Sequence, residues 1–348
     1  MTSLKKSFNI TGIAIFLITF IVFFMSAERV GSLWDCGEFI LGAYKLQVVH
    51  PPGAPIFLLI GRLFTWIATI FSDDPSMIAF SVNLMSGIST SLAAVFAGWI
   101  SMMFGKIGMV GREGTTDASQ NMALSFAGLV AGLSTAFASS IWFSAVEGEV
   151  YAMSTMFTAL TYWAAVKWYF LPNVKDSDRW LVLSLFASGL SIGVHLLSLL
   201  TFPAIALLFY LKKYETRSIL GGLISLIIGV LGIGFVQKVI IVMIPTLWKN
   251  LEIFMVNSLG MPVHSGLIPT VLILAALSYF LLRYAHNNGK YYLQLFTVAS
   301  ILITIAFSTI GTVVIRANAD TPVNMNVPSD ALRLLPYLNR EQYGERAL

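Results

Sequence analysis

The stretch GAPIFLLIGRLFTWIATIF, residues 53–71, decides how this chain is arranged, because it is apolar enough to enter a membrane yet carries Arg62 at its middle. An arginine at the centre of a bilayer costs about 2.5–3.5 kcal/mol on insertion scales. This cost favours a helix that lies in the membrane interface, or re-enters it, over a helix that crosses it. The choice sets the sidedness of every later segment.

The composition identifies an integral membrane protein. Of the 348 residues, 57% are hydrophobic and only 11% are charged, and the mean hydropathy is +0.81. Soluble domains carry about 25% charged residues. Apolar runs of about 20 residues recur without strand-like alternation, and helices satisfy their backbone groups internally. We therefore expect an all-α, multispanning bundle, and the pattern excludes a β-barrel.

Nine membrane spans are predicted from the apolar runs. The first run follows Lys5 and Lys6 and is interpreted as a retained helix, because no convincing small-x-small cleavage site is present. The apolar run 180–211 is split near His195, since it is too long for one ordinary span; a single tilted helix is the alternative. The predicted spans are 8–25, 78–104, 122–141, 150–170, 180–195, 196–211, 218–244, 267–283 and 291–315.

The basic residues support the interfacial interpretation of 53–71. With that helix in the interface at the outer face, every basic cluster falls on the inner side, as the positive-inside rule requires. These clusters are Lys5/Lys6, Lys106/Arg112, Lys175/Arg179, Lys212/Lys213/Arg217 and Arg283/Lys290. The outer side then receives the first outer loop, 26–77, and the loops 142–149 and 245–266. We expect a transmembrane domain over 1–315 and a polar periplasmic segment over 316–348 that leads into a soluble domain.

Ionisable residues gather in the first outer loop. Asp35 and Glu38 are three residues apart and share one face of a helical turn. His50 precedes Pro51-Pro52, which stiffens the backbone and holds the imidazole at the mouth of the next helix. Carboxylates beside a membrane indicate a general base or a cation site, with helix capping as the alternative. The single cysteine, Cys36, excludes an intrachain disulfide, and no neighbouring base marks it as a nucleophile.

Further polar residues are predicted on the same side. Glu147, Glu149 and Tyr151 lie at the turn between two spans, as binding residues or as simply solvated ones. His195 is an ionisable group in an apolar run, so it is either functional or a packed core histidine. Arg316 leaves the last span where a guanidinium could hold a phosphate, with snorkelling as the alternative.

Four blocks in order resemble a known family. They are WDCGEFI…YKLQVVHPPGAPIF, SIWFSAVEGEVYAMS, SIGVHLLSLL and IRANADTPVN…YLNREQYGERAL, and they cover almost the entire chain. The first is similar to the first outer loop of protein O-mannosyltransferases, which are multispanning GT-C glycosyltransferases. Together, the blocks resemble more closely a membrane family common in Bacteroidota that is related to a vertebrate protein O-mannosyltransferase.

The resemblance implies an inverting glycosyltransferase in the inner membrane. It would move a sugar, mannose by analogy, from a polyprenyl-phosphate donor to Ser/Thr hydroxyls of exported proteins at the periplasmic face. No Gly-rich sugar-nucleotide fingerprint appears, in keeping with a lipid-linked donor. Membrane lipids are expected around the chain, and no nucleic acid is expected as a partner.

The resemblance also implies roles for particular residues. Asp35, or else Glu38, is the expected catalytic base. His50, Glu147, Glu149 and Tyr151 are expected to bind substrate, and Arg62, His195 and Arg316 to lie near the lipid phosphate. No metal or other cofactor is expected, and a metal held by Asp35, Glu38 and Glu149 is the minority alternative.

Two differences from the related enzymes keep alternatives open. The acids here are spaced D-x-x-E, whereas eukaryotic protein mannosyltransferases carry adjacent acids, so the base is either Asp35 or Glu38. Members of the closer family are also longer, with a soluble outer domain, which leaves acceptor recognition open. The alternative from another class is a transporter or flippase for lipid-linked sugars. Such proteins commonly contain inverted repeats, and none is detected here.

Overall fold

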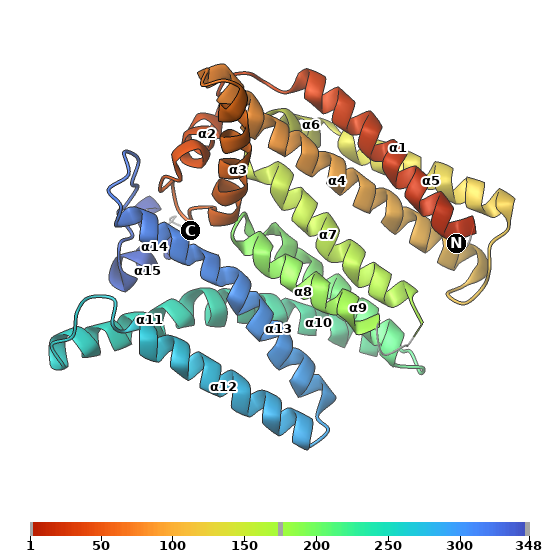
Figure 1. Ribbon diagram of the computed structural model, residues 1–348. Helices are drawn as coiled ribbons and strands as arrows, with labels where there is room; N and C mark the ends of the chain where they lie inside the picture. The colour runs from red at the N-terminus through yellow and green to blue at the C-terminus, as the bar shows by residue number, and fades with distance from the viewer. Residues whose placement is uncertain (1–2, 173–176, 345–348) are drawn as a thin grey trace.

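The computed structural model describes residues 3–172 and 177–344, and within these ranges the chain is all-α (Figure 1). The β-type pairing in this part of the chain is an isolated bridge between Val48 and Asn324. The helices are α1 Ser3–Ser26, α2 Cys36–Lys45, α3 Pro55–Phe71, α4 Pro75–Val110, α5 Ala118–Ala136, α6 Ser139–Val146, α7 Val150–Phe170, α8 Asp178–Ile192, α9 Phe202–Lys213, α10 Ile219–Phe235, α11 Ile244–Ile253, α12 Leu267–Asn287, α13 Tyr291–Phe307, α14 Gly311–Ala317 and α15 Ala331–Asn339.

Several helices continue through short segments of different winding. The 3₁₀ segment Leu196–Thr201 leads into α9, and the π-helical segments Val236–Met243 and Phe254–Ser258 join α10 and α11 into one 40-residue helix, Ile219–Ser258. The 3₁₀ turns Ser308–Ile310 and Glu341–Tyr343 follow α13 and α15.

Six helices of the described residues are long and apolar enough to cross a membrane, or seven if the bent pair α5–α6 is one span. These include α1, α4, α12 and the continuous helix from α10. The prediction of an all-α, multispanning membrane protein is therefore confirmed. The two predicted spans that became α7 and α8 are not among the six, so the count of nine stays a prediction.

The centre of the bundle is the long helix α4, against which α1, α5 and α7 pack, while α7 continues the packing onto α8. Glycines allow the backbones to approach closely. A Cβ at Gly98 would lie 2.9 Å from the carbonyl oxygen of Gly128, and one at Gly132 would lie 2.9 Å from that of Ala94. Small residues at helix contacts are the usual means of tight packing within membranes.

The end of α4, the end of α7 and the end of α9 lie at one end of the bundle, and hydrogen bonds join basic residues there. Arg112, after α4, donates a hydrogen bond to the carbonyl of Leu171, after α7. Lys212, at the end of α9, donates to the same carbonyl at 3.1 Å. Asp178, at the start of α8, accepts from the Tyr291 hydroxyl at 3.4 Å. Residues of the predicted Lys106/Arg112 and Lys212/Lys213/Arg217 clusters thus lie close together. Lys175 lies outside them.

The first outer loop begins and ends at the opposite end. The Asn83 side chain, in the N-terminal part of α4, donates to the carbonyls of Glu28 and Val30, which follow α1. The helices α2 and α3 lie between these points at that same end (Figure 1). Helix α3 therefore stays at this end and does not carry the chain to the basic end. This agrees with the prediction made from Arg62, at the middle of the helix.

The apolar run that was split near His195 does turn there. Helix α8 ends at Ile192, and the backbone N–H of Ile56, at the start of α3, donates to the carbonyl of Gly193 at 2.8 Å. Helix α9 then returns to the basic end. The two-helix interpretation of the run is correct.

The segment after Arg316 folds back onto the first outer loop. The Val48 backbone bonds to Val323 and Met325, each at 3.0 Å. The Tyr337 hydroxyl, from α15, donates to the Val49 carbonyl at 2.5 Å. Buried side chains from both parts form one apolar cluster, which comprises Val48, Trp248, Val313, Val314, Ala317, Ala331, Leu334 and Tyr337. The C-terminal segment is therefore part of the same structure as the outer loop.

Candidate active site

Asp35 occupies the N-cap position of α2 but, among the described residues, does not cap the helix with its side chain. Its backbone N–H instead donates to Glu149 Oε1 at 3.1 Å, which joins the first outer loop to the turn before α7. The Asp35 side chain is 58% exposed. The capping alternative is therefore not what the structure shows, and the carboxylate is accessible to a substrate.

Glu38 and His50 form a closed pair. Glu38 Oε1 accepts the backbone N–H of His50 at 2.7 Å, and Oε2 lies 2.9 Å from His50 Nδ1. The ring of Phe39 packs edge-on against the imidazole, with centroids 5.4 Å apart. Both oxygens of Glu38 are thus engaged by one residue, which orients the imidazole and leaves Glu38 little capacity to accept a substrate proton.

The second ring nitrogen of His50 faces Asp35. Nε2 lies 3.9 Å from Asp35 Oδ2, which is ion-pair range but beyond a hydrogen bond. Glu38, His50 and Asp35 therefore form a line in which a carboxylate orients an imidazole and the imidazole faces a second, exposed carboxylate. The spacing of Asp35 and Glu38 and the position of His50 predicted that these groups would be close, and the structure brings them together.

The charges in this line support one another. The hydrogen bond from Glu38 raises the pKa of His50, against the effect of burial, and the negative charges of Glu38 and Asp35 raise it further. Burial alone would raise the pKa of Glu38, but the bonds and the charge from His50 outweigh it and the pKa falls. Both pKa shifts favour the carboxylate form of Glu38 and the protonated form of His50.

Glu149 lies beside this line, and its pKa is shifted in the direction opposite to that of Glu38. It is 7% exposed, and burial together with the negative charge of Asp35 raises its pKa to about 7, while the N–H of Asp35 opposes that shift. Glu147, half-buried before it, adds a smaller effect in the same direction as burial. Glu149 is therefore close to half-protonated at neutral pH, unlike Glu38.

Cys36 has a structural position. Its side chain is fully buried, the backbone N–H of Gly148 donates to Sγ at 3.2 Å, and Sγ lies 3.7 Å from Asn83 Oδ1. This agrees with its interpretation as a residue that is not a nucleophile.

Tyr151 and His195 lie together at the start of α7 and after α8. Their ring centroids are 5.6 Å apart. Nδ1 of His195 is buried and has no hydrogen-bond partner within the described residues. Buried polar atoms are usually paired, so this nitrogen is consistent with a ligand-facing position as well as with packing.

The structure does not bring Arg62 and Arg316 to the acid–imidazole line. Arg62 donates to the carbonyl of Tyr44, and Arg316 donates to those of Leu46 and Lys45 at 2.6 and 3.1 Å. These carbonyls end α2, whereas Asp35 begins it. The last carbonyls of a helix lack partners within the helix, so the two guanidinium groups supply them.

Two residues at the site were not singled out from the sequence. Trp34 directly precedes Asp35, is 91% exposed and has φ of 60°, a conformation that bulky residues rarely adopt. Arg340 follows α15 with φ of 59°. Burial lowers the pKa of His195, with a smaller contribution from the charge of Arg340, and the same charge slightly opposes the raised pKa of His50. Trp34 could have been noted as the neighbour of Asp35, but no local pattern marks Arg340.

Metal binding is the remaining possibility at this point. Ligand atoms of Asp35, Glu38 and His50 all lie within 4.8 Å of one another, close enough to hold an ion. Glu149, the third ligand in the minority alternative, is not in this group. Glu38 binds the N–H and Nδ1 of His50, and Nε2 faces Asp35, so the same three residues form a hydrogen-bonded acid–imidazole line.

The fold and the site define a multispanning, all-α membrane protein with an acid–imidazole site at one end of its bundle. The sequence family described as the protein O-mannosyl-transferase TMEM260 N-terminal domain matches residues 35–218. This match covers more than half of the chain and includes Asp35, Glu38, His50, Glu149 and His195. The chain belongs to this family.

Two curated relatives extend this result. The protein O-mannosyl-transferase tmem260 of Dictyostelium discoideum is 25% identical over 177 residues, which cover 51% of this chain and 19% of the relative. The protein O-mannosyl-transferase TMEM260 of Mus musculus is 27% identical over 182 residues, 52% of this chain and 22% of the relative. The chain thus matches about a fifth of each relative's length. No solved structure matches the chain.

Proposed function

We propose that this chain is the membrane part of an inverting glycosyltransferase. It moves a sugar, mannose, from a polyprenyl-phosphate donor to Ser or Thr hydroxyls of exported proteins, with the Asp35 end of the bundle facing the periplasm. The family and the names of its relatives support protein O-mannosylation. The observation that carries the assignment of the site is that His50 engages both oxygens of Glu38 and leaves Asp35 exposed.

In this proposal Asp35 is the catalytic base. It takes the proton of the acceptor hydroxyl as that oxygen forms a bond to the anomeric carbon of the sugar. The bond from this carbon to the phosphate oxygen breaks, and its electron pair leaves with the lipid phosphate. A single displacement inverts the anomeric centre. The imidazole of His50, oriented by Glu38, lies beside Asp35, with Nε2 3.9 Å from Oδ2, and a positioned carboxylate is suited to general-base catalysis.

The departing phosphate needs positive charge more than it needs a proton. Because Arg62 and Arg316 are bound to the carbonyls of α2, we assign this role to Arg340. Arg340 is exposed, and it follows α15, whose Tyr337 hydroxyl donates to the carbonyl of Val49, the residue before His50. A guanidinium can hold a phosphate through two parallel hydrogen bonds.

Trp34 is assigned to the sugar. An exposed indole beside the base offers a flat apolar face to a pyranose ring, and unusual backbone conformations often occur at functional positions. Trp34→Asn tests this role, since asparagine tolerates positive φ and removes only the ring. We expect the donor KM to rise about five- to tenfold, as for the loss of about 1–1.4 kcal/mol. Trp66→Asn, at a 56% exposed tryptophan of α3, is the control for simple membrane anchoring.

The direct test of the function is transfer by the purified chain. The protein is placed in nanodiscs with radiolabelled polyprenyl-phosphate mannose and a Ser/Thr-rich peptide, and labelled peptide is measured with the stereochemistry of the new linkage. The proposal expects peptide labelling with an inverted linkage. Donor hydrolysis or movement of donor across a sealed membrane, without labelled peptide, would overturn it. The transporter alternative gains no support from the fold, because Asp35, Glu38 and Glu149 gather at one end of the bundle.

A further inference from the structure

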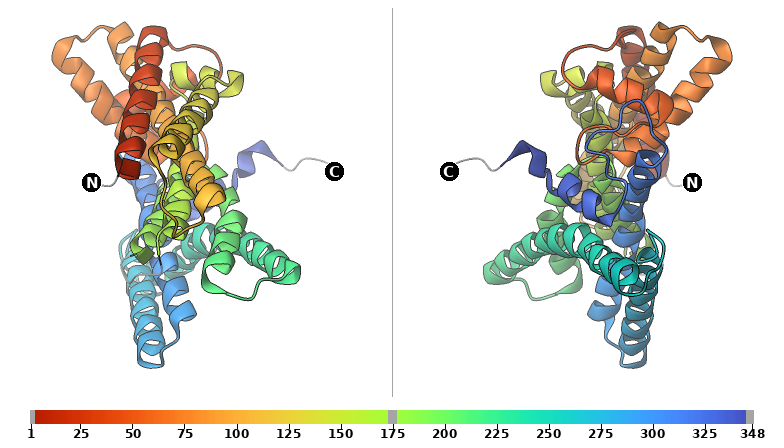
Figure 2. Two further views of the ribbon diagram at one scale, coloured as in Figure 1. Left: turned by 90° about the vertical axis from the view of Figure 1, so that its right-hand side faces the viewer. Right: turned by 90° about the vertical axis from the view of Figure 1, so that its left-hand side faces the viewer.

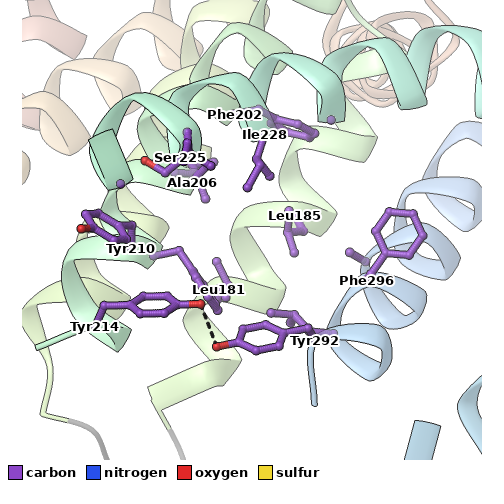
Figure 3. A pocket seen from close by; sticks show the side chains of 18 residues that line it. Leu181, Leu185, Phe202, Ala206, Tyr210, Tyr214, Ser225, Ile228, Tyr292 and Phe296 are labelled. Atoms are coloured by element: carbon purple, nitrogen blue, oxygen red, sulfur yellow. Dashed lines mark hydrogen bonds between the residues drawn. The ribbon is translucent and has the colours of Figure 1, made fainter. Parts of the chain in front are cut away.

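A cavity lies in the half of the bundle away from Asp35. It has a volume of about 500 Å³ and lies between α8, α9, α10 and α13 (Figure 3). Its walls are almost wholly apolar, and Leu185, Phe202, Phe209, Ile224, Ile228 and Phe296 contribute most of the large side chains. Figure 2 shows the helix pairs α9–α10 and α12–α13 diverging as two arms. The outer face of α10, one of the walls, carries exposed apolar side chains such as Leu220, Leu223 and Ile227.

The polar atoms of this cavity are concentrated at one end. The hydroxyls of Tyr214 and Tyr292 lie 3.2 Å apart (Figure 3). The Tyr210 hydroxyl accepts the backbone N–H of Ser218 at 2.9 Å, at the turn into α10. This end coincides with the basic end of the bundle, where α9 finishes and α13 begins. The cavity is therefore amphipathic along its length.

Two cations lie at the polar end. Lys213 Nζ is 5.1 Å from the ring centroid of Tyr291, which in turn lies 5.5 Å from that of Tyr292. Arg217 donates one hydrogen bond to the Leu211 carbonyl at 3.0 Å and is otherwise exposed. Lys212 does not add to them, because its ammonium points inward to the carbonyls of Trp168 and Leu171.

The nearby acids do not cancel this charge. The oxygens of Asp178 accept from Trp168 Nε1 at 2.8 Å and from the Tyr291 hydroxyl at 3.4 Å. Glu215 is exposed in the turn between α9 and α10. Bonds from neutral donors leave Asp178 charged, and the buried ammonium of Lys212, bonded to the carbonyl of the same Trp168, offsets that charge. Lys213 and Arg217 then outnumber Glu215 by one, so the polar end carries a net positive charge.

We propose that this cavity binds one acyl chain of an anionic phospholipid from the leaflet at the basic end, with the lipid phosphate at Lys213 and Arg217. Apolar walls at membrane depth match a hydrocarbon chain, and juxtamembrane cations attract anionic headgroups. The polyprenyl donor is a poorer match, since its phosphate belongs at the Asp35 end and would leave both cations without an anion. The exclusion of the donor rests on the proposed function, whereas the lipid site itself takes no part in the proposed transfer reaction.

The test uses phosphatidylglycerol that carries a photoreactive diazirine in its acyl chain. The full chain is reconstituted in nanodiscs, irradiated, digested and mapped by mass spectrometry. We expect labelled peptides from 202–214 and 221–232, with unlabelled phosphatidylglycerol a better competitor than phosphatidylcholine. Lys213→Gln or Arg217→Gln should each reduce that preference about fivefold.

Cavity-filling variants make the test specific. Ala206→Phe, on α9, and Ala299→Phe, on α13, fill the cavity from opposite walls, and each should abolish labelling of these peptides. If one of them fails to fold, the other still decides. Leu272→Phe, on a 63% exposed position of α12, is the control that should change nothing.

Three results would overturn the proposal. Uniform labelling of exposed faces that neither filling variant alters would indicate surrounding lipid only. Competition by polyprenyl phosphate above phosphatidylglycerol would assign the cavity to the donor tail. Absence of labelling inside the cavity, with labelling elsewhere, would show that no lipid chain enters it.

Discussion

The two ends of the bundle use ionisable residues in opposite ways. At the basic end the buried cations are saturated by carbonyls: Lys106 donates to Gly111 and Arg112 at 2.8 and 2.7 Å, and Lys212 donates to Trp168 and Leu171. At the other end Glu38 is saturated by His50, but Asp35 keeps an exposed carboxylate. Saturated groups stabilise structure, whereas a supported but incompletely paired group is available for chemistry.

The arginines also differ in whether their guanidinium groups are bound to backbone carbonyls. Arg62 and Arg316 lie at the Asp35 end but behave as cations of the basic end do, since each donates to carbonyls at the end of α2. Arg340 is exposed and follows α15, which is bonded through Tyr337 to the residue before His50. Proximity to the correct end of the molecule is therefore not enough to assign function. The hydrogen-bond partners of each group must also be counted.

The largest effect is expected from a substitution of Asp35, the exposed carboxylate of this comparison. Asp35→Asn keeps the shape of the side chain and the backbone bond to Glu149, but an amide cannot accept the hydroxyl proton. We expect turnover to fall about 10²–10⁴-fold with unchanged thermal stability. Asp73→Asn, at an acid of the same loop, is the matched control and should remain active. Normal turnover of Asp35→Asn would remove Asp35 from the role of base.

A smaller effect is expected from the closed pair. Glu38→Gln removes the charge that raises the pKa of His50, and the loss of a charge-assisted bond corresponds to about a ten- to hundredfold fall in turnover. Activity that needs imidazolium is lost as pH rises through the pKa of His50. Because that pKa falls in the variant, the alkaline limb of the pH–rate profile should move to lower pH. A lower rate with an unmoved limb would indicate a purely structural role for Glu38.

The arginines offer a test of the second comparison. Arg340→Gln should raise the donor KM about tenfold, as expected for a lost phosphate contact, without changing the acceptor KM. Arg316→Gln should instead lower the free energy of unfolding by about 1–3 kcal/mol and leave the donor KM unchanged. The opposite pattern would support the sequence-based assignment of Arg316 to the phosphate.

The smallest effect concerns Glu149 and is a pH dependence of stability. Its pKa in the folded chain, about 7, is above the usual value for glutamate. The folded state therefore binds the proton more tightly, and stability falls as pH rises from about 4.5 towards 7 and is constant above it. Glu149→Gln keeps an oxygen for the Asp35 N–H and should flatten this part of the thermal stability profile. An unchanged slope would assign the dependence to another group.

The sequence predicted the architecture well because the apolar runs and the charges between them can be identified from short stretches of the chain. Arg62 within an apolar stretch and the side of each basic cluster were enough to place α3 outside the spans and to turn the chain near His195. The number of spans was harder to predict. Helices α7 and α8 form as expected, but they are not among the helices that are both long and apolar enough to cross a membrane.

The candidate site was only partly predictable. The spacing of Asp35, Glu38 and His50 within one loop brought those three together. The bond from Asp35 to Glu149 joins residues far apart in the chain, and Arg316 meets Leu46 across an even longer separation. No local pattern encodes such partners, so the sequence could not distinguish the arginines that close α2 from the arginine that remains exposed.

The central claim is that Glu38 is occupied and Asp35 is available as the base. It is tested most directly by measuring turnover at saturating donor and acceptor for Asp35→Asn and Glu38→Gln in the same nanodisc preparation. The account predicts that Asp35→Asn is the more severely impaired, by at least about tenfold. An active Asp35→Asn enzyme beside an inactive Glu38→Gln enzyme would contradict it and move the base to Glu38.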